Sequence, residues 1–507
     1  MTPRTLLSFG LALLLPAVTS GELTVAGMFT SHMVLQQGMP TPVWGKAAAG
    51  EVVTVEFTGQ RQQTTANRTG DWLVKLAPLS ASAEPRTLTI TGSADTGTIE
   101  LFDVLVGEVW FASGQSNMQM PVGNKIRPDA YPGVENFTSE VEAANHPHLR
   151  LFKVRAQSTL QPAHDLIGGN WQVCTPQSAE TFSAAAYFFG RYLLKHVQAP
   201  IGIIVSAQSS TTAEQWMSLD SLAEFPQFAG AVAFYRDPAT VLLPKQELSA
   251  RSPAKHPSLL FNCGVAPVIP FAIRGAIWYQ GESNASRAEE YRKLLPALIR
   301  DWRRQWTQGD FPFLLVQLAG FKSVPQLPGE DAWAELREAQ ALTAASMTNV
   351  FLATALDIGM VDRIHPVNKR EVGRRLGLVA REKVYGQKTL SSGPMFRKMT
   401  IQGARVLIDF DSPGAGLVSR NAQHPGRVSG FAIAGGDRQW MWAEAELNGN
   451  TCVVSCPKIA DPVAVRYGWA RNLECDLYNE AGLPALPFRT DDWPLSTAGK
   501  RYEAFPP

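Results

Sequence analysis

The chain has 507 residues, of which 46 are basic and 45 are acidic, so its formal net charge is +1. Without a long run of either sign, this balance gives no electrostatic reason to expect a nucleic acid or an anionic membrane as a partner. The composition, 45% hydrophobic and 18% charged, excludes a disordered chain, and the length predicts more than one domain.

The first residues have the pattern of an export signal. Arg4 precedes an apolar stretch over residues 6–18, and small residues follow near Ser20. This pattern predicts a secretory signal peptide that is cleaved near Ser20, and therefore a periplasmic or extracellular protein. The apolar stretch is shorter than a spanning helix needs, and no other segment is apolar for long enough, so we expect no membrane span after cleavage.

Beyond the signal, β-type patterns open and close the chain. Residues 22–101 contain short runs such as "PVWGKAAAGEVVTVEFTG", "DWLVKL" and "RTLTITGS", broken by Gly, Pro, Asp or Asn. This spacing predicts a small β-sandwich. After residue 386 short alternating strands return, as in "ARVLIDFD", "GFAIAG" and "VAVRYGW", and they predict a β-rich region.

The middle of the chain predicts an α/β layer. Apolar strand candidates "VLVGEVWFA", "IGIIVSA", "RGAIWY", "FPFLLVQL" and "NVFLATAL" alternate with helical stretches such as "SAAAYFFGRYLLKHV" and "EEYRKLLPALIRDWRRQW". Such alternation is typical of a mostly parallel sheet covered by helices. The predicted division is a signal peptide at 1–20, a β-sandwich at 21–101, an α/β domain at 102–386 and a β-rich domain at 387–507.

Polar clusters follow several of the central strands. They lie at residues 114–117, 209–212 and 280–284, and a fourth, "DRIHP", follows a later strand. Because the carboxyl ends of parallel strands meet at one edge of a sheet, functional groups gather on the loops there. The sequence therefore predicts a site built from these four loops.

Cysteine usage predicts neither a disulfide framework nor a metal site. The cysteines are odd in number and sparse for this length: Cys174, Cys263, Cys452, Cys456 and Cys475. Cys452 and Cys456 lie in a stretch whose alternation suits a strand, and no His or Cys pair follows at zinc-finger spacing. We therefore expect no metal and no other cofactor.

Ser116 is the candidate nucleophile. It stands in "ASGQSNMQMP" at a strand-to-helix turn, with Gly114 two residues before it. Met118 at the position two residues after it distinguishes this turn from the GxSxG elbow of α/β-hydrolases. A serine hydroxyl needs a neighbouring base and donors for the oxyanion that forms on attack, and in isolation a turn or capping serine is the simpler interpretation.

His365 is the candidate base. Pro366 biases His365 toward an extended backbone and can open the helix that follows, so the imidazole is predicted on a loop before that helix. Asp362 lies three residues earlier on the same loop, near enough to accept from one imidazole nitrogen while the other faces Ser116. The other histidines lie among turn residues, in a polar loop or at a helix end, and have weaker claims.

Three stretches together resemble a known family. "VLVGEVWFASGQSNMQMPV", "GAIWYQGESNA" and "DRIHPVNKREVGRRL" are similar to the sialate O-acetylesterase-like carbohydrate esterases of the SGNH hydrolase superfamily. The likeness extends to "TSHMVLQQGMPTPVWGKAAAGEVVTVEF" and to "PVAVRYGWARNLECDLYNEAGLPALPFRTDDW", so it covers nearly the whole mature chain. It implies an α/β fold, with an SGNH-type three-layer α/β/α parallel-sheet domain and flanking β-sandwich domains.

The resemblance implies a catalytic role for three residues. Ser116 would be the nucleophile, His365 the general base and then the acid, and Asp362 the orienting carboxylate. Relatives often have another residue three positions before the histidine, so Asp357, Glu282 or a serine–histidine dyad without a carboxylate are alternatives.

The resemblance also implies an oxyanion hole. It would consist of the backbone N–H of Ser116, the backbone N–H of Ser210 and the side-chain amide of Gln280, with Asn284 as the second choice for the amide. Where the family usually has a Gly-Gly pair, this chain has Ser209 and Ser210. Either serine can donate its N–H, but only in a backbone conformation allowed to a residue with a Cβ atom.

Trp216 and Arg337 are the residues that the resemblance suggests for holding sugar by stacking and hydrogen bonding. The stretch between Trp216 and His256 is shorter than in longer relatives, which have an inserted β-domain there. A changed cleft, and so a changed substrate, would be one consequence.

We therefore expect an exported, metal-independent carbohydrate O-acetylesterase that works through an acetyl-Ser116 intermediate. Its partner would be an O-acetylated carbohydrate, either sialic acid or a plant hemicellulose such as xylan or xyloglucan. An inactive SGNH scaffold that binds glycans is the alternative, supported by the loss of the paired glycines. A lipase or protease with the same triad is disfavoured, because neither an apolar lid nor a processed pro-segment is evident.

Overall fold

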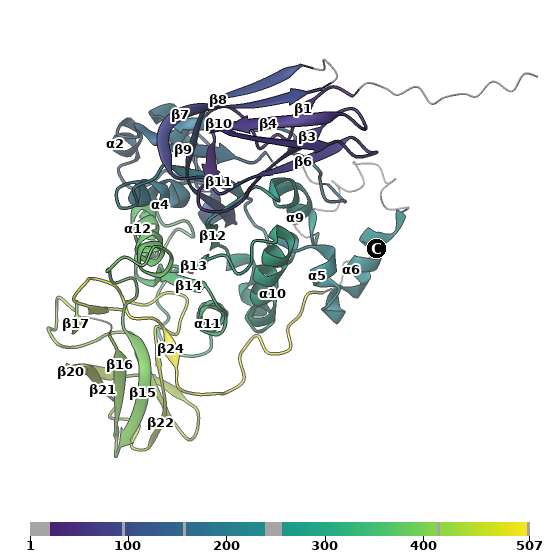
Figure 1. Cartoon of the computed structure of the whole chain (residues 1–507). Coiled ribbons are helices and arrows are strands. Elements are labelled where there is room, and N and C mark those ends of the chain that lie inside the picture. The colour runs from purple at the N-terminus through teal and green to yellow at the C-terminus, as the bar shows by residue number, and fades with distance from the viewer. Residues whose placement is uncertain (1–20, 94–96, 156–158, 239–255, 413–415, 504–507) are drawn as a thin grey trace, which may run out of the picture.

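The computed structural model describes residues 21–93, 97–155, 159–238, 256–412 and 416–503. The predicted signal peptide at 1–20 lies outside these ranges. Figure 1 shows three parts: amino-terminal strands, a central body in which helices cover a sheet, and carboxyl-terminal strands on the far side of that body. Along the chain the elements thus follow the order β, α/β and β.

The amino-terminal strands form two groups. One sheet has the order β1-β3-β6, and in the other β4 pairs with β5 and β7, while β7 and β2 pair with β8. The strands are β1 (Thr24–Val25), β2 (Val34–Gln36), β3 (Thr41–Lys46), β4 (Val52–Phe57), β5 (Gln60–Thr65), β6 (Asp71–Leu76), β7 (Ser82–Gly92) and β8 (Thr98–Gly114). In β6 buried and exposed residues alternate, as expected for a strand with one face on a core.

Strand β8 belongs to both the amino-terminal region and the central body. Its first half pairs with β7, antiparallel, and with β2, while its second half lies between β11 and β12. The division predicted between residues 101 and 102 therefore falls inside one continuous strand of 17 residues. At that point β8 changes from partly exposed to fully buried, and its pairing with β7 shifts register between Leu101 and Val104.

The central sheet has the order β10-β9-β11-β8-β12-β13-β14. All neighbouring pairs are parallel except β9 with β10 at one edge. The strands not yet given are β9 (His146–Lys153), β10 (Trp171–Cys174), β11 (Ile201–Ala207), β12 (Gly275–Tyr279), β13 (Phe313–Gln317) and β14 (Val350–Thr354). β12 and β13 are buried along their whole lengths, which explains why their sequences are apolar up to Gln317 at the end of β13.

Helices cover both faces of this sheet, so the predicted three-layer α/β/α arrangement is confirmed. Successive residues of β8 point to opposite layers: the Trp110 ring lies 5.1 Å from Phe189 of α4, and the Phe111 ring lies 5.4 Å from Trp302 of α10. The helices are α1 (Ser116–Gln119), α2 (Phe137–Glu142), α3 (Pro176–Glu180), α4 (Ala184–Leu194), α5 (Leu219–Leu222), α6 (Ala229–Arg236), α9 (Leu259–Gly264), α10 (Ala288–Trp306), α11 (Ala332–Ser346) and α12 (Lys369–Val379).

Helix α12 begins later than its sequence suggests. Pro366 precedes it, but the first helical residue is Lys369, and the side chain of Asn368 caps the helix by accepting from the Glu371 N–H at 3.1 Å. Residues 359–368 therefore form a loop between β14 and α12, and His365 lies on it as predicted.

The carboxyl-terminal strands form three further sheets that share a second core. They are β15 (Met395–Gln402), β16 (Arg405–Asp411), β17 (Leu417–Ser419), β18 (Phe431–Gly435), β19 (Trp440–Trp442), β20 (Glu444–Asn448), β21 (Thr451–Ser455), β22 (Pro462–Tyr467), β23 (Leu477–Asn479) and β24 (Phe488–Arg489). After β24 the chain returns to the central body, where Tyr502 stacks on Phe228 with 4.5 Å between ring centroids (Figure 1). All five cysteines are buried and free, and no helix of the described part is long and apolar enough to cross a bilayer.

The carboxyl ends of the three middle strands meet at Gly114. This residue pairs with Ala207 at the end of β11 and with Tyr279 at the end of β12. It has φ +139, and a Cβ atom at this position would lie 2.2 Å from the Tyr279 carbonyl oxygen. Only glycine therefore permits the strands to approach this closely before the chain turns into α1.

Replacing Gly114 with alanine should destabilise the protein by about 2 to 4 kcal/mol, because it combines a clash with a strained backbone. Gly59→Ala is the matched control, since Gly59 also has positive φ (+80) but meets nothing within 4 Å. Urea unfolding followed by circular dichroism measures both variants. Equal losses in the two would show that the close approach at Gly114 is not what requires glycine.

Candidate functional site

Ser116 occupies the first position of α1, directly after β8. The Gln115 N–H donates to the Tyr279 carbonyl at 3.0 Å, and the Gln115 Oε1 accepts from the N–H groups of Gly281 and Ser283 at 3.4 and 3.2 Å. These bonds fix the turn between the strand and the helix. The Ser116 residue is 6% exposed, so its surroundings are largely closed to bulk solvent.

The His365 imidazole is oriented by a backbone carbonyl. Its Nδ1 lies 3.0 Å from the carbonyl oxygen of Ala130. A carbonyl only accepts hydrogen bonds, so Nδ1 carries the proton in the neutral ring and Nε2 is left as the basic nitrogen. The ring also packs on Tyr131, with 5.1 Å between centroids. Burial lowers the pKa of His365 below its ordinary value, and the nearby charge of Lys369 lowers it further.

A hydrogen bond joins the residues next to Ser116 and His365. The Asn117 Nδ2 donates to the Ile364 carbonyl at 3.0 Å, which holds the serine turn against the histidine loop. Within the described ranges no hydrogen bond links the Ser116 hydroxyl directly to the imidazole. In enzymes without bound substrate such bonds are often long and tighten only in the complex.

None of the three candidate carboxylates contacts the imidazole. The side chain of Asp362 is 71% exposed and lies 3.6 Å from Arg363, so this loop turns it toward solvent. Asp357 is held by Arg375 at 2.6 and 2.8 Å and by Tyr478. Glu282 accepts from the Asn117 amide at 2.5 Å. Sequence spacing placed Asp362 on the right loop, but the chain between Asp362 and His365 does not turn its carboxylate inward.

The second loop is bonded to α1 through Ser209. Ser210 adopts the left-handed conformation, with φ +59, that a glycine would take, and no acceptor for its N–H lies within the described part of the chain. Ser209 is anchored, because its N–H and hydroxyl both donate to the Gln119 Oε1 of α1, at 2.9 and 2.7 Å. The Tyr131 hydroxyl also bonds Ser209, so the residue that packs on His365 braces this loop as well.

Gln280 and Asn284 are buried and engaged with other groups. The Gln280 Nε2 donates to the Thr211 carbonyl at 3.0 Å and to the Asn284 Oδ1 at 2.7 Å. Asn284 in turn accepts from the Ala213 N–H at 2.9 Å and donates to Glu214 at 3.0 Å. Both side chains are 0% exposed. In this structure their hydrogen bonds tie the third loop to the second.

Trp216 and Arg337 are buried as well, which does not fit their expected contact with sugar. The Trp216 indole donates to the Thr211 hydroxyl at 3.1 Å and is 1% exposed. The Arg337 guanidinium is 0% exposed and donates to four backbone carbonyls, of Leu318, Ala319, Ala470 and Arg471. It therefore joins the carboxyl-terminal region to α11. The sequence around Trp216 and Arg337 suggested exposed loops and gave no sign that either side chain is buried.

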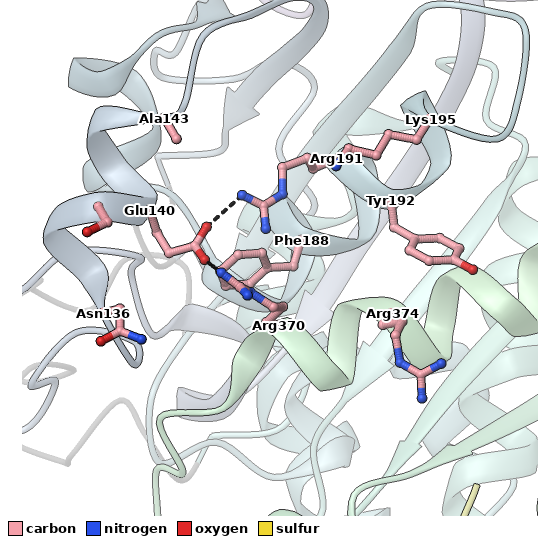
Figure 2. A pocket seen from close by; sticks show the side chains of 10 residues that line it. Asn136, Glu140, Ala143, Phe188, Arg191, Tyr192, Lys195, Arg370 and Arg374 are labelled. Carbon is pink, nitrogen blue, oxygen red and sulfur yellow. Dashed lines mark hydrogen bonds and ion pairs between the residues drawn. The ribbon is translucent and has the colours of Figure 1, made fainter. Parts of the chain in front are cut away.

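Ion pairs in a pocket lined by basic side chains attach the segment after Ala130 to two other helices. Figure 2 shows Glu140 of α2 paired with Arg191 of α4, at 2.6 Å, and with Arg370 of α12. The pocket has a volume of about 620 Å³, and Lys195 and Arg374 also line it. Because Ala130 precedes α2 and His365 precedes α12, the ion pair between these two helices helps to keep the carbonyl within hydrogen-bond distance of the imidazole.

Three further side chains connect the loops beneath Ser116. Asn117, Glu282 and Lys369 form a buried chain of hydrogen bonds, in which the Lys369 Nζ donates to the Asn117 Oδ1 at 2.6 Å. Burial lowers the pKa of Lys369 to about 7 and raises the pKa of Glu282. The described part of the chain contains no group of three or more His, Cys, Asp or Glu side chains that could hold a metal ion.

Several of these residues were missed by sequence reasoning. Ala130 acts through its carbonyl, so no side-chain signal could have identified it. Tyr131 precedes a proline in an irregular stretch without a motif. Asn117 and Lys369 lie inside "GQSNM" and "DRIHPVNK", so their places in those motifs were the available signal.

Comparisons with known proteins agree on one family. Residues 254–381 match the family model described as carbohydrate esterase, sialic acid-specific acetylesterase. The human and mouse sialate O-acetylesterases are 29% and 28% identical to this chain, over 91% and 95% of it and 91% and 97% of their own lengths. A crystal structure of a carbohydrate acetylesterase from Xanthomonas citri is 36% identical, covers 93% of this chain and 100% of its own, and superposes with a TM-score of 0.81.

The environment of His365 predicts that its imidazole titrates below the ordinary histidine pKa and is neutral at pH 7. An NMR titration of the ¹³C-labelled histidines measures this, with His365→Gln used to assign the signal among the eight histidines. A midpoint at or above the ordinary value would contradict the burial of the ring.

Proposed function

The chain belongs to the sialate O-acetylesterase-like carbohydrate esterases of the SGNH superfamily and is a carboxylic ester hydrolase; on that premise we propose that it removes acetyl groups from sugars through an acetyl-Ser116 intermediate. The observation that carries this proposal is the bond between Asn117 and Ile364, at 3.0 Å. The bond supports the proposal because Ser116 is the neighbour of Asn117 and His365 is the neighbour of Ile364.

Acylation begins with transfer of the Ser116 proton to the His365 Nε2. The tautomer set by the Ala130 carbonyl leaves this nitrogen unprotonated, and its lowered pKa keeps it so at neutral pH. The Ser116 Oγ then attacks the acetyl carbonyl. When the tetrahedral intermediate collapses, the imidazolium returns the proton to the departing sugar oxygen.

The oxyanion would be held by backbone N–H groups of Ser116 and Ser210. Ser116 is the first residue of α1, where the N–H has no acceptor within the helix. Ser210 has φ +59, the left-handed conformation that a glycine would take, which supports its backbone N–H as the second donor. One such donor typically stabilises the transition state by about 3 kcal/mol. We assign Gln280 to holding the second loop instead of to the oxyanion.

Deacylation uses the same groups in the reverse order. Water takes the place of the sugar, and the His365 Nε2 removes its proton as it attacks the acetyl carbon. Collapse of the second tetrahedral intermediate releases acetate and restores the Ser116 hydroxyl.

The mechanism requires no carboxylate beside the imidazole. The Ala130 carbonyl accepts from Nδ1, which fixes the tautomer and the orientation of the ring. In a triad the aspartate has both of these roles. A carbonyl is neutral and stabilises the imidazolium less than a carboxylate would. We therefore propose a Ser116–His365 dyad in place of the triad that the D-x-x-H spacing suggests.

Serine-dependent acetate release tests the proposal. The mature protein and its Ser116→Ala variant are incubated with acetylated sialosides, acetylated xylan and acetylated xyloglucan, and acetate is measured. We expect release from one class of substrate and a loss of about 10⁴-fold or more in Ser116→Ala. Equal release by both proteins would exclude the serine mechanism, and glycan binding without any release would favour an inactive, glycan-binding scaffold.

The exposed position of Asp362 gives a second prediction. Asp362→Asn should keep kcat/KM within about twofold, whereas loss of an orienting carboxylate in a serine triad costs about 10⁴-fold. His365→Gln is the comparison variant and should abolish turnover. Initial rates of acetate release at neutral pH measure both, and a loss in Asp362→Asn comparable to that in His365→Gln would restore the triad.

A further inference from the structure

Asn117, Glu282 and Lys369 come from three separate segments of the chain and meet in one buried cluster. Asn117 follows the nucleophile, Glu282 lies two residues after Gln280, and Lys369 is the first residue of α12. Asn117 is 2% exposed and Lys369 is 0% exposed. The Glu282 Oε2 is buried and has no hydrogen-bond partner within the described ranges. Buried charges of this kind are costly, so their retention calls for a physical reason.

The Asn117 amide is saturated by this cluster. Its two N–H groups donate to the Glu282 Oε1 at 2.5 Å and to the Ile364 carbonyl at 3.0 Å, and its oxygen accepts from the Lys369 Nζ at 2.6 Å. Flipping the amide would direct its oxygen at a carboxylate and its N–H at an ammonium. The two charges therefore allow only one orientation of Asn117.

That orientation determines the distance between the two proposed catalytic groups. Ser116 moves with Asn117, and His365 moves with Ile364. The bond between Asn117 and Ile364 forms only while the amide N–H points at the histidine loop. A change at Lys369 or Glu282 would thus act on Ser116 and His365 without touching the substrate.

Resting on the proposed function, we propose that Lys369 and Glu282 are positioning residues, which act through Asn117 to hold Ser116 against His365, and that the Lys369 ammonium also acts electrostatically on the imidazole. The hydrogen bonds of the cluster hold the turn that carries Ser116 against the loop that carries His365.

The charges that bear on this cluster can be traced. The groups that act electrostatically on Lys369, Glu282 or His365, or respond to them, are Arg127, Tyr279 and Tyr291, and the Lys369 Nζ lies 5.3 Å from the Tyr279 ring centroid. The pKa of Lys369, about 7, lies above the lowered pKa of His365. Lys369 is therefore protonated over the range in which the imidazole titrates, and it disfavours the imidazolium there.

Removing the Lys369 charge should move the acidic limb of the pH profile. Without the ammonium the pKa of His365 rises, so the imidazole becomes protonated, and inactive as a base, at a higher pH. We expect the midpoint of the acidic limb of kcat/KM to shift upward by about half a unit to one unit in both Lys369→Met and Lys369→Gln. At the plateau we expect kcat in Lys369→Met to fall by about tenfold or more with KM unchanged, since the substrate contacts remain.

The experiment uses hydrolysis of 4-nitrophenyl acetate from pH 4 to 9, about the range that brackets both groups. Lys293→Met, an identical change at an exposed lysine of α10, is the matched control and should keep the wild-type profile. Thermal unfolding of each variant reports its fold. A smaller folded fraction lowers the apparent kcat but leaves the midpoint where it was, so Lys369→Gln tests the proposal even if Lys369→Met folds poorly.

Unshifted midpoints in both variants, with wild-type thermal stability, would overturn the electrostatic role, and a wild-type plateau kcat in Lys369→Met would overturn the positioning role. Failure of the proposed function would appear differently. In that case Ser116→Ala would hydrolyse the ester as fast as the wild type does, whatever the Lys369 variants show.

Discussion

The parallel ladder that β8 forms with β11 and β12 is the constraint on which the whole site depends. Because Gly114 pairs with both Ala207 and Tyr279, the three strands end at one level and their loops start beside one another. The approach is so close that a Cβ atom at Gly114 has no room. Contacts between residues far apart in sequence, such as Gln115 with Gly281, follow from this geometry.

The imidazole is held by backbone and by packing. The Ala130 carbonyl fixes the proton on Nδ1, and Tyr131 packs on the ring while its hydroxyl reaches the second loop. One short segment therefore controls both the base and a proposed oxyanion donor. The ion pairs of Glu140 then attach that segment to α4 and α12. The histidine ring is thus oriented by a backbone carbonyl, by packing on Tyr131 and by ion pairs that fix the neighbouring segment.

Much of the fold could be predicted from the sequence. The spacing of apolar residues and the length of each apolar segment distinguish buried parallel strands such as β12 from amphipathic helices such as α10. Ser116 and His365 could be placed on their loops, since glycine and proline mark the turns around them. Asp362 could not be oriented, because side-chain direction on an irregular loop depends on dihedral angles that no periodicity encodes. Burial of Trp216 and Arg337 was likewise invisible, since tertiary packing decides it.

The continuous course of β8 also bears on which parts of the site can vary. Strand β8 runs from the sheet that it forms with β7 into the central sheet, where its end lies between β11 and β12, so no linker separates the amino-terminal sheets from the layer that carries the candidate site. The loops that carry Ser116, Ser210 and His365 lie outside this frame, so their sequences can change without altering the strand pairing that supports them.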